Sequence, residues 1–352
     1  MCRPDRRTPP PTHPPRWLRV VVAVAYAATV LITWRVWQHR ASPPMLPLLP
    51  LPSVSVGAAM LATIAWAALR PREGTVAHAL VLAYAVATDE LRAQPYVLSL
   101  ALLQWGASSS GPGLTLARAH LVSLWLWGGL HKAASPAFFH TTAPWLWTGV
   151  PSRALRGFAP HFGYAVVATE LGLAALALVP RTRRVAAALA VVTHLGILAL
   201  ISRPSLGRNV ALWPWNLCLA AAAVGLLAPW REAWRETLRR EARPVLAAAA
   251  LLLVAPAGYE AGVIGPTLAH VLYTGAVPET VRCSADGRCD ADAERRETIR
   301  ELRVMIPPEP RLQRRYFRAT CRAGDRLMLH DPRRDDDEGP QVEEIRCPRQ
   351  AP

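Results

Sequence analysis

The hydrophobic positions of this chain gather into long apolar runs separated by short polar or proline-containing segments. Nine runs predict membrane-spanning helices, because a bilayer needs roughly 17–25 apolar residues in a helix. They lie at about Leu18–Trp37, Leu46–Leu69, Val76–Thr88, Pro95–Ala107, Leu114–Leu130, Phe162–Val179, Val185–Ile201, Val210–Ala228 and Pro244–Tyr273. The third and fourth runs are short and interrupted by Asp89, Glu90 and Arg92, so they predict either tilted spans or one re-entrant hairpin. The pattern therefore predicts an all-α polytopic membrane bundle of about eight or nine transmembrane helices over residues 17–275.

The two ends of the chain differ in composition from this apolar region. Residues 1–16 are rich in proline and arginine, which predicts a disordered cytoplasmic arm. Residues 276–352 are polar and predict a small α+β domain outside the membrane. The expected elements of this domain are a helix at 291–303 and strands at 316–323, 326–330 and 342–347. The acidic run from Asp335 to Glu338 predicts a solvated loop, with a weak calcium site as the alternative.

Four of the six cysteines lie in the C-terminal region. They are Cys283, Cys289, Cys321 and Cys347. An even number of cysteines in a small domain predicts two disulfides in an oxidising compartment, with the pairing left open. Zinc binding is the competing interpretation, but Cys283 and Cys289 lack the short spacing of common zinc knuckles. We therefore expect a disulfide-bonded domain and no metal site.

Composition and charge favour a membrane protein over a nucleic-acid-binding protein. The chain is 52% hydrophobic and carries a formal net charge of +15. Its arginines cluster before the first predicted span, after the second, between the sixth and seventh, and before the last. In a nine-span bundle these clusters share one side, which the positive-inside rule makes cytoplasmic, so the C-terminal domain is exocytoplasmic. We expect a bacterial inner-membrane protein whose basic residues face the lipid bilayer, and no nucleic-acid partner.

Lys132 is the single lysine among forty basic side chains. A lysine amine can lose its proton in a poorly hydrated site and act as a base, whereas a guanidinium cannot. Lys132 and its neighbour His131 end the fifth predicted span. Snorkelling of a long cationic side chain at a helix end is the alternative role.

Other polar residues map to the same outer half of the predicted membrane, and only His120 maps nearer the inner side. This clustering predicts one outward-facing cavity. The candidate catalytic residues are Lys132, His131 and His194, and the candidate cofactor-binding residues are Glu170, Asn209, Trp213 and Asn216. The structural alternatives are an ion pair of Glu170 with an arginine such as Arg208, a packing role for His194, and an interhelical hydrogen bond from Asn216.

The segment from Gly129 to Phe139, Gly-Leu-His-Lys-Ala-Ala-Ser-Pro-Ala-Phe-Phe, resembles the Gly-x-Lys-Lys region of vitamin K-dependent gamma-carboxylases. Their bacterial relatives, the horizontally transferred transmembrane (HTTM) family, share this region. The resemblance places Lys132 where the family keeps its catalytic lysine. His131 replaces the first lysine of the pair, and the C-terminal region is far smaller than the carboxylases' luminal region. DoxX-like quinone-associated proteins carry a similar Gly-Leu-x-Lys pattern at a helix end.

The carboxylase resemblance implies that Lys132 deprotonates a reduced naphthoquinone, after which oxygen generates a strong base beside the substrate. It further implies that His131 and His194 relay protons and that Asn216 orients a quinone oxygen. The DoxX-like resemblance implies instead a non-catalytic subunit that binds a quinone or lipid for a partner redox protein. A transporter or scaffold in which the same residues line a solute path is a third hypothesis.

Overall fold

A helical bundle and a smaller α+β unit make up the computed structural model, which describes residues 13–109, 111–148, 150, 157–202, 210–291, 293–335 and 339–348. The bundle contains α1 (Arg16–Ile32), α2 (Gly57–Leu69), α3 (Pro71–Thr88), α4 (Pro95–Ser108), α5 (Pro112–Ala134), α6 (Ala143–Thr148), α8 (Ala159–Leu178), α9 (Arg183–Ile201), α10 (Leu212–Ala222), α11 (Trp234–Arg240) and α12 (Arg243–Val254). Short 3-10 segments are η1 (Trp34–Trp37), η2 (Glu90–Arg92) and η6 (Ala255–Tyr259), and π-helical segments are η3 (Phe138–Thr142) and η5 (Ala223–Leu227). Pro71, Pro95 and Pro112 each stand at the first position of a helix, where their fixed φ favours the helix and their missing N–H costs nothing.

The prediction of eight or nine transmembrane helices is wrong. Among the described residues, two helices, α8 and α9, are long and apolar enough to cross a membrane. The run predicted from Leu46 becomes helical only at Gly57, because three prolines, Pro47, Pro50 and Pro52, interrupt the stretch before it. The resulting helix α2 has 13 residues, which reach about 20 Å at 1.5 Å per residue, against the ~30 Å hydrocarbon core of a bilayer.

Two further features explain why hydropathy overcounted the spans. Helices α3 and α5 have the length to cross a bilayer, but ionisable residues interrupt their apolar sequence, including Glu73 in α3 and Arg118 in α5. The last predicted run ends its α-helix at Val254, just before Pro256, and continues as a short 3-10 segment. A proline cannot continue the α-helical hydrogen-bonding pattern.

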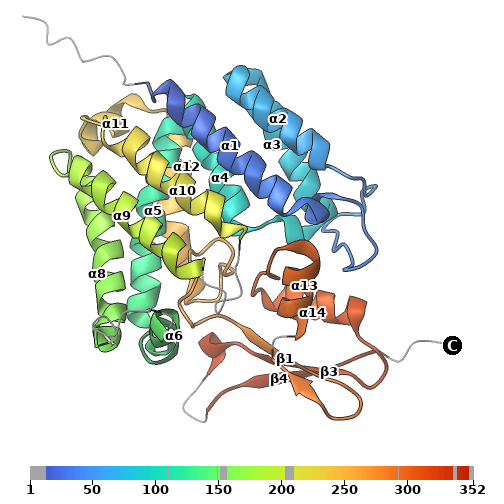
Figure 1. Cartoon of the computed structure of the whole chain (residues 1–352). Helices are drawn as coiled ribbons and strands as arrows, with labels where there is room; N and C mark the ends of the chain where they lie inside the picture. The colour runs from blue at the N-terminus through green and yellow to red at the C-terminus, as the bar shows by residue number, and fades with distance from the viewer. Residues whose placement is uncertain are drawn as a thin grey trace, which may run out of the picture.

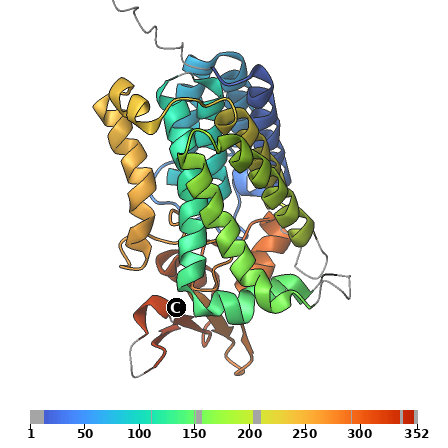
Figure 2. The same cartoon turned by 90° about the vertical axis from the view of Figure 1, so that its left-hand side faces the viewer.

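Helix α5 is the central element of one half of the bundle, because α4, α8 and α12 all pack against it. Helix α1 packs against α2, α4 and α10 in the other half. Figure 2 shows α12 at the edge of the bundle away from α1. Ser123 and Trp127 of α5 hydrogen-bond to the carbonyl oxygens of Leu252 and Leu253, at 2.6 and 2.7 Å, and so fasten α12 to the bundle.

The C-terminal unit is an antiparallel sheet with two helices, α13 (Ala293–Leu302) and α14 (Pro310–Thr320). The strand order is β2-β1-β3-β4, with β1 at Glu279–Cys283, β2 at Cys289–Asp290, β3 at Arg326–His330 and β4 at Val342–Arg346. The short 3-10 segment η7 (Pro332–Arg334) follows β3. Leu327, Leu329 and Ile345 point to one face of the sheet and form a small core with Phe317 of α14. Figure 1 shows α13 and α14 between this sheet and the helical bundle.

Most of the elements expected in the C-terminal region are confirmed. The helix expected at 291–303 is α13, and the strands expected at 326–330 and 342–347 are β3 and β4. The strand expected at 316–323 is wrong, because Tyr316 and Phe317 belong to α14. Leu312 and Tyr316, four residues apart, are both buried, which is the spacing of a helix face. The short strands β1 and β2 were not predicted.

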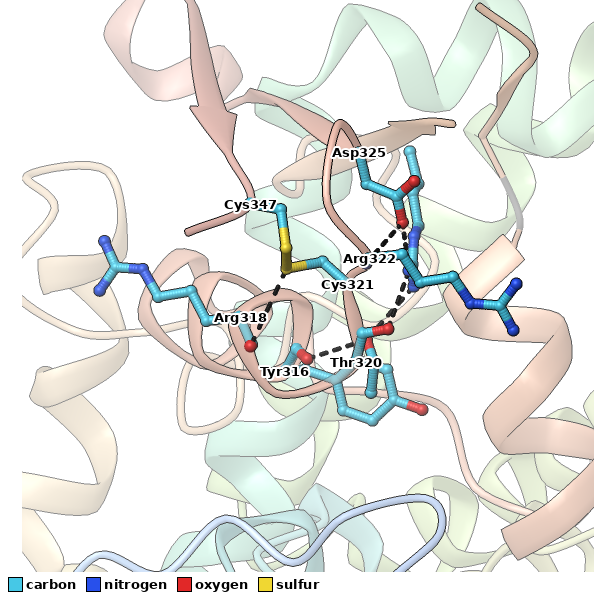
Figure 3. The surroundings of a disulfide bond; sticks show 8 residues. Tyr316, Arg318, Thr320, Cys321, Arg322, Asp325 and Cys347 are labelled. Atoms are coloured by element: carbon cyan, nitrogen blue, oxygen red, sulfur yellow. Dashed lines mark hydrogen bonds and ion pairs between the residues drawn. A yellow bond between two sulfur atoms is a disulfide. The ribbon is translucent and has the colours of Figure 1, made fainter. Parts of the chain in front are cut away.

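The two expected disulfides are confirmed. Cys283 bonds to Cys289, and Cys321 bonds to Cys347. The second disulfide joins the end of α14 to the end of β4 (Figure 3). Beside it the Asp325 carboxylate accepts hydrogen bonds from the Arg322 amide, at 3.0 Å, and from the Arg282 guanidinium, at 2.7 Å. These contacts crosslink a unit whose own apolar core is small.

Ion pairs fasten the C-terminal unit to the bundle at Glu90 of η2. The buried Glu90 carboxylate receives Arg315 of α14 at 2.8 Å and pairs also with Arg311 of the same helix. Nearby, the Gln94 side chain donates to the carbonyl oxygen of Met305 at 3.1 Å. The two units therefore meet along a polar seam at this edge.

Candidate functional site

Lys132 is buried and forms an ion pair with Glu170. Its Nζ lies 2.8 Å from both carboxylate oxygens of Glu170 and 3.3 Å from the carbonyl oxygen of Gly128. Lys132 stands in the last turn of α5, and Glu170 in the middle of α8. The structure thus brings together two of the predicted site residues. The pair joins the end of α5 to the middle of α8.

Of the two glycines before Lys132, Gly129 is the one that allows α5 and α8 to approach closely enough for this pair. A Cβ at Gly129 would lie 2.9 Å from side-chain carbons of Leu171, closer than such contacts allow. A Cβ at Gly128 would lie 3.4 Å from a Glu170 oxygen, which is an ordinary contact. Small residues at helix crossings allow backbones to approach in this way. The Gly-Gly-Leu-His-Lys segment therefore has a packing role in addition to any chemical one.

His131 lies on another side of α5 and does not join the Lys132 pair. Its Nδ1 is 3.0 Å from a carboxylate oxygen of Glu260, which is itself largely exposed. Its ring packs 5.4 Å from the rings of Trp127 and Tyr259, measured between centroids. His131 therefore packs α5 against the segment that follows α12.

His194 and Asn216 form a separate buried group. The Trp125 indole donates to His194 Nε2 at 3.2 Å, and His194 Nδ1 lies 3.1 Å from the Asn216 side-chain oxygen. The Asn216 amide donates in turn to the carbonyl oxygen of Leu212 at 2.9 Å. All the ring nitrogens of His194 are thereby used within the protein. Among the described residues no hydrogen bond links this group to Lys132.

The remaining two predicted site residues contribute less. Trp213 is partly buried, and its indole nitrogen makes no hydrogen bond to any described residue. Asn209 lies outside the described residues, as does Arg208. Among the described residues, the predicted site residues other than Trp213 thus lie in three separate polar contacts: Lys132 with Glu170, His131 with Glu260, and His194 with Asn216.

A large cavity lies elsewhere, at the junction of the bundle and the C-terminal unit. Its volume is about 850 Å³, and its walls come from α4, α5, α10, α12, α13, α14 and the segment 264–281. Apolar side chains line most of it, with leucine and proline the commonest. Ligand sites typically have volumes of roughly 300–1,000 Å³ and apolar walls with a few polar groups. This cavity is therefore the candidate site.

One polar group in the cavity wall is centred on His120 of α5. Its Nε2 lies 2.8 Å from the Ser99 hydroxyl, which also accepts a hydrogen bond from the Trp215 indole at 2.9 Å. The His270 ring faces His120, with the centroids 5.5 Å apart. His120 Nδ1 and both ring nitrogens of His270 make no hydrogen bond within the part of the chain that the structure describes.

The C-terminal unit adds a second polar group, which includes Glu294 of α13. Glu294 is only 6% exposed, and neither of its carboxylate oxygens has a hydrogen-bond partner among the described residues. Burial raises the pKa of this carboxyl to about 7, although Arg282 opposes the shift. A side-chain oxygen of Gln313, also in the cavity wall, lacks a partner in the same sense.

The segment that covers the cavity has an unusual backbone. His270 and Tyr273 have φ angles of 61° and 60°, in the left-handed region that L-residues other than asparagine and aspartate seldom adopt. Both residues line the cavity. Backbone strain of this kind concentrates at functional sites, because surrounding structure must hold it in place.

Sequence reasoning missed this site because its parts are far apart in the chain. His120 was noticed but assigned to the inner side, away from the other polar residues. Ser99 and His270 carry no local motif. An available signal was the string of prolines and glycines between Pro256 and Pro278, which is unlike a transmembrane helix and marks the irregular covering segment.

No protein-family model, curated protein or solved structure matches this chain. The resemblance of the Lys132 segment to the carboxylases and to DoxX-like proteins therefore stays a prediction.

Proposed function

We propose that this protein is a membrane-associated binding protein that holds an amphiphilic small molecule, a quinone or a lipid, in the cavity between the bundle and the C-terminal unit. The observation that carries the proposal is the cavity of about 850 Å³, apolar over most of its wall and provided with the His120 and Glu294 groups. An apolar wall removes the body of such a ligand from water, and the polar groups orient its head.

Membrane association is supported by α8 and α9. Only 28% of the apolar window of each helix is buried in the protein. Large apolar side chains such as Tyr164, Val185 and Val192 are exposed on them. A core helix of a soluble protein is covered on most sides, so this exposed surface fits contact with lipid.

The orientation that we propose follows the arginines and the cysteines. Arg181, Arg183 and Arg184 lie at the turn between α8 and α9, at the end of the bundle where α1 begins. The disulfide-bonded unit lies at the opposite end (Figure 1). The positive-inside rule and the need for an oxidising compartment both favour arginines in the cytoplasm and disulfides outside, as in a bacterial inner membrane.

Ligand binding can be tested on the purified full chain. Mass spectrometry of protein isolated in several mild detergents should detect a co-isolated quinone or lipid, and added decylubiquinone should quench tryptophan fluorescence saturably. Leu124 of α5 lines the cavity, so Leu124→Trp should narrow it and weaken both signals. Leu130→Trp, on an exposed position of the same helix, is the matched control. Absence of any bound or titratable amphiphile, or equal behaviour of the two variants, would falsify the proposal.

Base chemistry on a quinol at Lys132 is the second candidate function. It is favoured by the burial of the Lys132 amine, in a segment that resembles the carboxylases. Lys132→Arg keeps the charge but removes the possibility of a neutral base. Retention of quinol-dependent activity by that variant would exclude the second candidate without affecting the first.

A further inference from the structure

The hydrogen bonds around Ser99 determine which nitrogen of His120 carries its proton. An indole N–H can only donate, so the Ser99 oxygen must be the acceptor from Trp215 at 2.9 Å. The Ser99 hydroxyl has one proton to give, and within the described residues its other partner is His120 Nε2 at 2.8 Å. If Ser99 donates to Nε2, both contacts of the Ser99 hydroxyl are satisfied, and the one donor left over is His120 Nδ1–H, in a side chain that lines the cavity. The opposite arrangement leaves over the proton of the Ser99 hydroxyl, whose oxygen already has two partners, so the first arrangement is the one that a ligand in the cavity can complete.

The consequence is that His120 holds its proton on Nδ1. A neutral imidazole donates from one nitrogen and accepts at the other. With Nε2 occupied as an acceptor, Nδ1–H is a donor without a partner among the described residues, in a residue that is only 5% exposed and lines the cavity. An unpaired donor in apolar surroundings is costly and is normally satisfied.

We infer that His120 is a ligand-binding residue whose Nδ1–H donates to a carbonyl oxygen of the bound amphiphile, and that Ser99 and Trp215 are positioning residues that fix this tautomer. The inference rests on the proposed function of the cavity. It narrows the ligand to an apolar molecule with a carbonyl group, as in a quinone or a fatty ester. The His270 ring also lines the cavity, 5.5 Å from the His120 ring between centroids, and its two nitrogens are unpaired among the described residues.

A purely structural histidine elsewhere in the bundle shows the contrast. His78 of α3 is also buried, but its Nδ1 contacts Thr63 and its Nε2 contacts Tyr26, each at 3.1 Å. Both of its nitrogens are thus used within the protein. His120 has the same burial and only one nitrogen used, and the other is left for a molecule that the chain does not supply.

The ligand class is tested by competition against decylubiquinone quenching with two carbonyl probes and one without a carbonyl. Methyl laurate represents an ester and undecan-2-one a ketone, while dodecane has the apolar body alone. Either carbonyl probe should compete at least about tenfold better than dodecane, because one hydrogen bond contributes roughly 1.4 kcal/mol. Equal competition by all three would overturn the inference. If decylubiquinone and these probes all fail to bind, the proposed function fails instead.

The role of His120 is tested with variants and a spectroscopic readout. His120→Leu should weaken decylubiquinone binding about tenfold, whereas His78→Gln, the matched control outside the cavity, should leave it unchanged. Ser99→Ala and Trp215→Phe keep the His120 side chain but remove the hydrogen bonds that fix its tautomer. These variants should therefore weaken decylubiquinone binding less than His120→Leu does. Nitrogen-15 NMR of labelled histidine should show the His120 proton on Nδ1 in the native protein and a mixture of tautomers in Ser99→Ala. Unchanged affinity in His120→Leu, or an Nε2–H tautomer in the native protein, would refute the assignment.

Discussion

Lys132 on α5 and Glu170 on α8 face each other through two contacts of 2.8 Å, one to each carboxylate oxygen. Both side chains are mostly buried, so neither is compensated by bulk water. Removal of one partner from such a pair leaves the other as an uncompensated charge, whereas replacement of both by apolar groups is often neutral. The pair is therefore expected to couple the stability of the two helices strongly.

Lys132→Met alone and Glu170→Leu alone should each destabilise the protein by about 3–5 kcal/mol, while the double variant should recover most of that loss. Thermal unfolding in one detergent, followed by circular dichroism, measures the effect. Additive losses in the double variant would show that the two residues do not interact.

The glycine pair at the α5–α8 crossing predicts an asymmetric response to alanine. Gly129→Ala places a methyl group 2.9 Å from Leu171 and should lower the melting temperature clearly, with a cost of about 1–3 kcal/mol from overpacking. Gly128→Ala introduces only ordinary contacts, so it should be nearly neutral. The two variants are each other's control. Equal destabilisation by both would contradict the crossing geometry.

Glu294 predicts a pH-dependent loss of stability. Its pKa rises from 4.5 to about 7 in the folded protein through burial, so between these pH values the folded state binds more protons than the unfolded state. Stability from this group therefore falls as pH rises from 4.5 to 7, by about 3 kcal/mol at roughly 1.4 kcal/mol per pKa unit. The charged groups that act on it are Arg282 of β1 and Glu297 of its own helix, with opposite signs.

Glu294→Gln should remove this loss and make the protein more stable than the native chain at pH 8, with little difference near pH 4.5. Denaturant unfolding at a series of pH values gives the comparison. Glu297→Gln, one turn further along α13 and bonded to Tyr316 at 3.0 Å, should not change the slope of stability against pH between 4.5 and 7 in this way. A native-like pH dependence in Glu294→Gln would show that the carboxyl is ionised in the folded protein.

The two disulfides should differ in their effect on stability. The Cys321–Cys347 bond closes a sequence separation of 26 residues and the Cys283–Cys289 bond one of 6. In the chain-entropy model a disulfide that closes a larger loop stabilises the folded state more. The larger loop is expected to contribute about 3 kcal/mol, and the smaller loop less. The serine variants of Cys321 and Cys347 should therefore loosen the C-terminal unit more than those of Cys283 and Cys289. Hydrogen exchange of α14 and β4 measures the difference, and the reverse order would contradict the prediction.

The predictability of this protein from its sequence depended on how local each signal was. Alternating positions in Arg326–His330, and cysteines in an even number, predicted strands and disulfides correctly because both signals are contained in short segments. Hydropathy overcounted the spans because it registers composition and not where prolines end a helix, as before Pro256. The segment from Tyr316 was predicted to be a strand because the predicted range began there. The four-residue helical spacing of buried positions appears only when Leu312 is included.

The candidate site was partly predictable. Lys132 and Glu170 were both assigned to the outer half of the predicted bundle, but the sequence left open which polar groups contact one another; in the structure these two form an ion pair. The cavity was not foreseen, since Ser99, His120 and His270 approach each other only through the packing of α4, α5 and the segment after α12. His120 was separated from the other polar residues by its expected depth in the membrane. That depth no longer applies, because most of the predicted spans are too short or too polar to cross a membrane.

The ion pairs at Glu90 bear on how fast a molecule in the cavity would exchange. Arg311 and Arg315 belong to the same helix as Gln313, which forms part of the cavity wall, and both arginines are anchored to that one carboxylate. If the cavity holds the proposed amphiphile, loss of these ion pairs would loosen α14 and should speed the exchange of the bound molecule. The exchange rate would then depend on residues that do not line the cavity.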